Sequence, residues 1–155
     1  MKKKILSLLV TMGLAASLVP VSVFADGTEV WDGSIAKSFA GGKGTKDDPY
    51  QIATGSQLAH FAERVNAEEY GEKYADTYFE LTEDIDLGGK EWTPIGETVA
   101  DLILGGTGYF AFAGNFDGNG HTIKNLTIGT ETSPYSGDVC GLFGAASGTI
   151  AGGGL

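Results

Sequence analysis

Two aspartates, Asp84 and Asp86, are the residues whose type and spacing most suggest chemistry. They alternate with Ile85 and Leu87, a period of two that is typical of a β-strand with one buried face. In an extended strand the two carboxylates lie on the same face, about 7 Å apart. Together with backbone carbonyls they could share a Ca²⁺ ion, since calcium prefers oxygen ligands; the alternative is that both are simply solvated. Asp84 and Asp86 are therefore candidate calcium ligands, and no residue is predicted to be catalytic or to bind a cofactor.

Other groups that could bind ions or phosphate lack the partners that such chemistry requires. Asp117 and Asn119 resemble the start of a calcium loop, but no Glu follows at the position an EF-hand needs, so they predict a turn. His121 has no second His or Cys near it and is predicted to be a hydrogen-bonded turn histidine. The run Gly41-Gly-Lys-Gly-Thr45 departs from the Walker spacing because a glycine separates its lysine from its threonine. The single cysteine, Cys140, allows no intramolecular disulfide and is predicted to be a small core residue.

One amphipathic helix is predicted over about residues 55–67. Thr54 can cap it, and Gln57, three residues later, completes a capping box. Its apolar residues recur at helical spacing and form one stripe, consisting of Leu58, Phe61, Ala62 and Val65. His60 and Arg64 fall off this stripe, which predicts that they belong to the solvated face.

A strand-and-turn pattern occurs twice in the second half of the chain. The segment Gly114-Asn-Phe-Asp-Gly-Asn-Gly-His-Thr-Ile123 is echoed by Gly141-Leu-Phe-Gly-Ala-Ala-Ser-Gly-Thr-Ile150. Repeats of this length indicate stacked units that bury their apolar faces only against their neighbours. We therefore expect an all-β solenoid, a coil of parallel strands, with the helix as an N-terminal cap over the open end of the first coil. The repeat register predicts two stacked pairs, Phe116 with Phe143 and Ile123 with Ile150.

The chain divides into three predicted segments. Three lysines at positions 2–4 precede an apolar run from Ile5 to Leu18, and small residues lead up to Ala25, as in a secretory signal peptide. The alternative, a transmembrane anchor, needs about 20 apolar residues and a different flank. The predicted boundaries are 1–25 for the signal peptide, 26–46 for a linker or lead-in and 47–155 for a β-helix module. Within this module the coils are predicted over about 77–155, and an insertion, interpreted as a hairpin, at about 97–113.

The net charge of the chain excludes some classes of binding partner. The formal net charge is −10, and removal of the signal peptide takes away three of the lysines. Nucleic acids and anionic membrane surfaces require a basic footprint, so neither is expected as a partner. We expect an exported protein that does not insert into a membrane after signal cleavage and whose partner is an extracellular ligand, a glycan or a host protein.

Six segments, in their order along the chain, resemble the GLUG-motif module of secreted bacterial surface proteins. They are Asp48-Pro-Tyr-Gln-Ile52, the helix from Gln57 to Asn66, Leu81-Thr-Glu-Asp-Ile-Asp-Leu-Gly88, Trp92-Thr-Pro-Ile-Gly96, Phe116-Asp-Gly-Asn-Gly-His-Thr-Ile-Lys-Asn-Leu126 and Gly141-Leu-Phe-Gly144. The module occurs in adhesin-like proteins and in the non-catalytic part of immunoglobulin A-cleaving metallopeptidases. The chain departs from the pattern at residues 97–113, which are longer than the usual link, and after Ile150, where the expected Asn-Leu is replaced by Ala-Gly-Gly-Gly.

The resemblance implies a right-handed parallel β-helix and a non-catalytic surface or secreted module that serves adhesion or the display of distal domains. The alternative is a polysaccharide lyase or glycoside hydrolase on a β-helix scaffold. The only arginine is Arg64, on the predicted helix, and the acids show no convergent pair of the kind that glycoside hydrolysis needs. We therefore expect no enzymatic activity within the chain, and any catalytic domain would lie beyond Leu155. The last repeat ends without a cap, which predicts the front part of a longer protein; the alternative is a complete small secreted protein.

Overall fold

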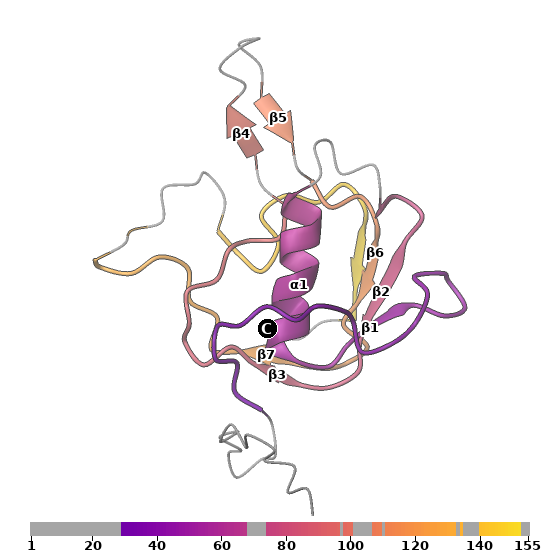
Figure 1. The fold of residues 1–155 in the computed structure, drawn as a ribbon. Helices are drawn as coiled ribbons and strands as arrows, with labels where there is room; N and C mark the ends of the chain where they lie inside the picture. The colour runs from indigo at the N-terminus through magenta and orange to yellow at the C-terminus, as the bar shows by residue number, and fades with distance from the viewer. Residues whose placement is uncertain are drawn as a thin grey trace, which may run out of the picture.

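The computed structural model describes residues 29–67, 74–96, 98–100, 107–109, 111–132, 134 and 140–152. The predicted signal peptide, residues 1–25, lies outside these residues. The described part contains one α-helix and eight short strands, arranged as shown in Figure 1.

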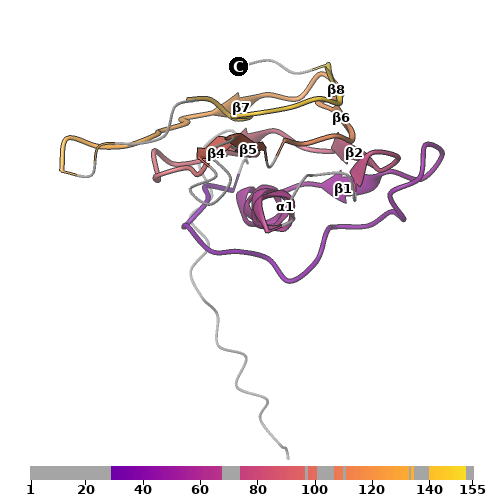
Figure 2. The ribbon, with the colours of Figure 1, turned by 90° about the horizontal axis from the view of Figure 1, so that it is seen from above.

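Parallel strand pairing organises the core. The largest sheet has four parallel strands in the order β1 (Tyr50–Ile52), β2 (Tyr78–Leu81), β6 (Asn115–Asp117) and β8 (Thr149–Ala151). A second, two-stranded sheet joins β3 (Ile85–Asp86) to β7 (Ile123–Lys124), also in parallel. Viewed from above, the strands of the large sheet lie one over the next, with β1 at one end and β8 at the other (Figure 2). Because the strands are short, side-chain packing rather than long hydrogen-bonded ladders must hold the layers together.

The helix α1 (Gly55–Asn66) begins as its capping pattern predicts. The Thr54 hydroxyl accepts a hydrogen bond of 3.3 Å from the Gln57 backbone N–H, and the Gln57 side chain accepts one of 2.8 Å from the N–H of Ala53. The first bond satisfies a donor that the first turn of a helix leaves open, and the second ties the residue before the N-cap to the helix. The prediction of the helix and of its N-cap is confirmed.

Aromatic rings join the helix to the sheet. Phe61 is fully buried, and its ring centroid lies 4.5 Å from that of Phe79 in β2 and 5.8 Å from that of Phe116 in β6. The same ring meets Phe112 at 5.2 Å and Phe143 at 6.3 Å. The helix therefore supplies the centre of the core against several successive strands.

The expected fold class is wrong. The sequence predicted an all-β solenoid, a right-handed parallel β-helix truncated at its C-terminal end, with the helix as a cap. The described chain instead forms a four-stranded parallel sheet, a separate two-stranded parallel sheet, a two-stranded antiparallel hairpin and a helix. The physical reason is the aromatic cluster: Phe61 reaches strands as distant along the chain as β6, so the helix is a core element and not a lid on the first coil.

The predicted stacking register is also wrong. Phe116 pairs with Ile150, between β6 and β8, and Ile123 pairs with Ile85, between β7 and β3. The register partner of Phe143 is Ile95. The two similar segments that begin at Gly114 and Gly141 therefore do not occupy equivalent strand positions. The rings of Phe116 and Phe143 are nevertheless in contact within the core, with centroids 5.2 Å apart.

Two further segments have definite places. Within 97–113, β4 (Thr98–Ala100) and β5 (Thr107–Tyr109) form an antiparallel hairpin, which points away from the sheets in Figure 1. The segment 29–46, interpreted from the sequence as linker, packs against the fold from residue 29 on. Trp31 is buried and its backbone N–H donates a 2.8 Å hydrogen bond to the carbonyl of Asp86. This segment therefore belongs to the folded unit.

Candidate functional site

Asp84, the first calcium candidate, bonds to the turn that precedes β7. Its Oδ1 accepts a 3.0 Å hydrogen bond from the backbone N–H of Thr122 and lies 3.2 Å from Nδ1 of His121. These two hydrogen bonds, from Thr122 first and His121 second, lower the pKa of the Asp84 carboxyl. The side chain of Asp84 is still more than half exposed, so the contact is a solvated one. His121 is accordingly a hydrogen-bonded turn histidine, as its sequence context predicts.

Asp86, the second candidate, is the only charged side chain buried among the described residues, with 7% of its surface exposed. Its Oδ1 accepts two hydrogen bonds of 2.8 Å, one from the N–H of Gly88 and one from the side-chain amide of Asn125. Its Oδ2 lies 3.7 Å from the Lys124 ammonium. Burial acts to raise the pKa of Asp86, but the bonds from Asn125 and Gly88 and the charge of Lys124 outweigh it, and the pKa is lowered.

The two carboxylates therefore accept hydrogen bonds from donors of the chain itself. Each accepts N–H groups from segments that follow it in the chain, so each cross-links neighbouring turns. Within the described residues, no group of three or more His, Cys, Asp or Glu is arranged to hold a metal ion. Calcium would have to displace the amide of Asn125 and the ammonium of Lys124 to reach Asp86.

The remaining candidates are placed as follows. Asp117 accepts a 2.8 Å hydrogen bond from the N–H of Asn119, which has a φ of 49°, so the predicted turn is confirmed. The prediction that Cys140 is a core residue is wrong: its side chain is exposed, and the residue that enters the core beside it is Leu142. The neighbouring Phe143 also packs against the core, so this segment meets the core through Leu142 and Phe143.

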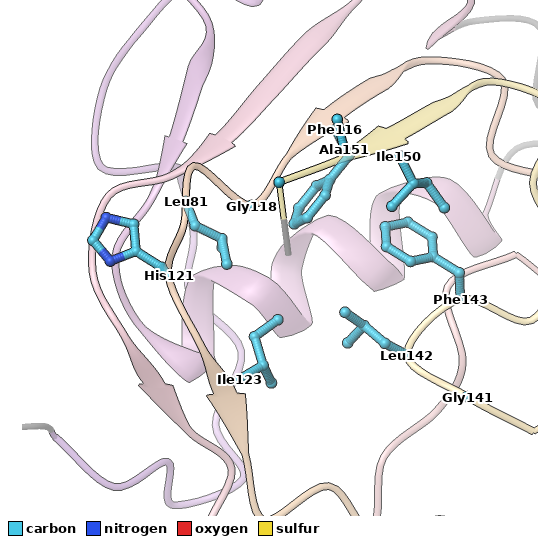
Figure 3. Close-up of a pocket in the computed structure, with 11 residues that line it drawn as sticks. Leu81, Phe116, Gly118, His121, Ile123, Gly141, Leu142, Phe143, Ile150 and Ala151 are labelled. Carbon is cyan, nitrogen blue, oxygen red and sulfur yellow. The ribbon is translucent and has the colours of Figure 1, made fainter. Parts of the chain in front are cut away.

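An apolar cavity of about 410 Å³ opens beside β8, at the end of the large sheet. Figure 3 shows the apolar side chains that surround it, with His121 at one side. The apolar lining side chains are Leu81, Phe116, Ile123, Leu142, Phe143 and Ile150. Ile150 is 47% exposed although it stands in register with the buried Phe116. The apolar side chains at this end of the large sheet are thus partly open to solvent.

The comparisons with known proteins give a similarity to part of a larger protein. The chain is 36% identical over 113 residues to the "Putative Gly-rich membrane protein" of Evansella cellulosilytica. The match covers 68% of this chain but 10% of that protein, so the chain spans about a tenth of the length of its relative. No protein-family model and no solved structure matches the chain. Within the described residues, no helix is both long enough and apolar enough to cross a membrane. The chain is therefore similar to a small part of a much larger Gly-rich protein.

Proposed function

We propose that this chain is a non-catalytic binding or structural module of an exported or cell-surface protein, in keeping with its resemblance to GLUG-motif modules. The observation that carries the proposal is that the two aspartates serve as hydrogen-bond acceptors within the fold. Asp84 and Asp86, which are the best candidates for chemistry, hold turns together through hydrogen bonds from Thr122, Gly88 and Asn125. Carboxylates committed to backbone and amide donors act as structural ties.

The cavity beside β8 supports the same proposal. Its lining side chains are apolar apart from His121, and the Nδ1 atom of that histidine lies 3.2 Å from Oδ1 of Asp84, which is outside the lining. Such a surface binds by burying apolar area, with little scope for proton transfer or for stabilising a developing charge. Similarity to a large Gly-rich protein is consistent with one module among several.

Export is part of the proposal. A tripartite signal peptide ending at Ala25 would make Asp26 the first residue of the exported protein. Expression of the full chain in a bacterial host, followed by fractionation and N-terminal mass spectrometry, tests this. We expect a mature N-terminus at Asp26. Retention of Met1 in the exported fraction contradicts it.

The proposed absence of catalysis is tested by measuring binding and turnover on the same polysaccharides. The purified protein is incubated with a panel of acidic and neutral bacterial and host polysaccharides. Retention on immobilised polymer is then compared with the release of reducing ends and of unsaturated products. We expect retention without product. Product formation that disappears in Asp84→Asn or Asp86→Asn would establish an enzyme and overturn the proposal.

A further inference from the structure

A second cavity, of about 540 Å³, lies where the segment before β1 passes over the exposed face of α1. This volume is within the range of small-molecule sites, about 300–1,000 Å³. Its lining combines cationic, aromatic and hydroxyl groups, and the described residues that line it include no acid. The side chains used below are Lys37, Ser38, Phe39, Tyr50, His60 and Arg64.

The cationic groups come from two elements. His60 and Arg64 are four residues apart on α1, so they are neighbours on one face of the helix. Lys37 joins them from the segment before β1. Burial and then the charge of Arg64 lower the pKa of His60, while Glu63 acts in the opposite direction.

This group of basic residues contrasts with the acidic composition of the chain. The chain has 20 acidic and 10 basic residues, and Arg64 is its only arginine. A cavity that gathers this arginine, a lysine and one of the two histidines concentrates basic residues on an acidic protein. Such a site attracts anions and fixes their orientation, because guanidinium groups bind carboxylates through two parallel hydrogen bonds.

Aromatic rings form the second feature of the cavity. Phe39 stacks on Tyr50 with ring centroids 4.8 Å apart, and its edge meets His60 at 5.0 Å. Both Phe39 and Tyr50 are only partly buried. They offer an apolar surface beside the cations, and the hydroxyls of Ser38 and Tyr50 add neutral hydrogen-bonding groups.

In the wall of the cavity, the backbone at Gly42 passes close to the backbone of Pro49. Gly42 has a φ of 80°, and a Cβ placed there would overlap the carbonyl oxygen of Pro49. The neighbouring Gly41 accepts a 3.0 Å hydrogen bond from the N–H of Gln51 in β1. The glycine run that superficially resembled a phosphate loop therefore serves to lay residues 40–44 against β1 and to shape the cavity.

We propose that this cavity binds the carboxylate-bearing ring of an acidic sugar, with Arg64 and Lys37 on the carboxylate and Phe39 and Tyr50 against the ring. The inference rests on the proposed function, since it names the ligand class of a non-catalytic binding module. A carboxylate is favoured over a bare anion because the cations stand beside a partly exposed aromatic pair, which matches a ligand with one charged and one apolar side.

Isothermal titration calorimetry on the full chain tests the inference. The ligands are uronic acid trisaccharides that differ in stereochemistry, each paired with its methyl ester, and inorganic phosphate. We expect at least one trisaccharide to bind and its methyl ester to bind about tenfold more weakly or worse, since a charge-assisted hydrogen bond is lost. Binding to no uronate, equal binding of acid and ester, or tighter binding of phosphate overturns it.

Variants locate the site. Arg64→Gln and Lys37→Gln each remove one exposed positive charge at the cavity, and Lys90→Gln removes one from an exposed turn elsewhere. We expect about tenfold weaker uronate binding in the first two and no change in Lys90→Gln. Thermal unfolding midpoints of all three variants separate a loss of affinity from a loss of structure. Equal affinities in all three variants contradict the assignment. Binding of neutral glycans alone would refute this inference while leaving the proposed function intact, whereas cleavage of any ligand would refute the proposed function itself.

Discussion

The side-chain amide of Asn125 donates a 2.8 Å hydrogen bond to the buried carboxylate of Asp86, and this bond ties the turn after β7 to β3. Asn125 occupies the left-handed region with a φ of 58°, a conformation that asparagine tolerates better than most residues. The same carboxylate oxygen accepts the N–H of Gly88. One acid therefore holds two turns of the fold together.

Removal of this acid should destabilise the protein. We expect Asp86→Ala to lower the free energy of unfolding by about 1–3 kcal/mol, because two donors in a buried place lose their acceptor. Urea unfolding followed by circular dichroism measures the change. Asp84→Ala is the matched control: its carboxylate is more than half exposed, so water can replace it and the loss should be smaller. Equal losses in the two variants would contradict the assignment of Asp86 as the main tie.

Stability should also depend on pH in the acid range. The pKa values of Asp84 and Asp86 both lie below the ordinary value of 3.8. A carboxyl group with a lowered folded-state pKa contributes stability that is present above its unfolded pKa and is lost as the pH falls through the folded pKa. The unfolding free energy attributable to these groups should therefore be level from about pH 7 to pH 5 and decrease below about pH 4.

Thermal unfolding between these pH values checks the sign. In Asp86→Asn the acid-induced decrease should be smaller than in the unaltered protein, since one of the two titrating groups is gone. A protein that gains stability on acidification, or a variant with an unchanged profile, would show that other groups control the transition.

Calcium should have little effect on stability. The Oδ1 atom of Asp86 already accepts two N–H donors, and Oδ2 lies near the ammonium of Lys124. An ion that bound only the folded state would raise the unfolding temperature by mass action. We expect equal midpoints in calcium and in chelator. A rise of the unfolding midpoint in calcium that disappears in Asp84→Asn would instead support the predicted calcium site.

A side chain at position 42 should disrupt the wall of the basic cavity. Gly42→Ala introduces a Cβ that overlaps the Pro49 carbonyl at a φ of 80°, so we expect a loss of about 1–3 kcal/mol or more. Gly120→Ala is the control, because Gly120 has a φ of 76° with open space around the added Cβ. Both variants carry the backbone strain, and only Gly42→Ala adds the collision. The difference between their unfolding free energies, measured in urea, isolates the close approach to Pro49.

Local interactions explain which elements were predictable. The helix α1 follows from Thr54, Gln57 and an apolar stripe that lie within a few turns of one another. The turn at Asp117 follows from a side chain that bonds its own backbone two residues on. These features depend on neighbours in the chain, so the pattern of residue types is sufficient to locate them.

The register and the layering could not be predicted in this way. The similarity of the two segments that contain Phe116 and Phe143 predicted that these rings stack in register. In the structure, Phe116 pairs with Ile150 and Phe143 pairs with Ile95. Strand pairing between distant segments is selected by the whole core, here by the ring of Phe61 that meets several strands at once. A motif that recurs along the chain carries no information about which copy packs against which surface.

The same distinction applies to the candidate sites. The sequence by itself determined the capped helix, the acidic balance of the chain and the places of its turns, because each depends on composition or on residues close together in the chain. Only the tertiary structure decided that Asp86 is a buried tie and that Lys37 joins His60 and Arg64 in one cavity. The reason is that burial and the meeting of charges arise when segments far apart in the chain pack together, and the free energy of that packing is shared by the whole core.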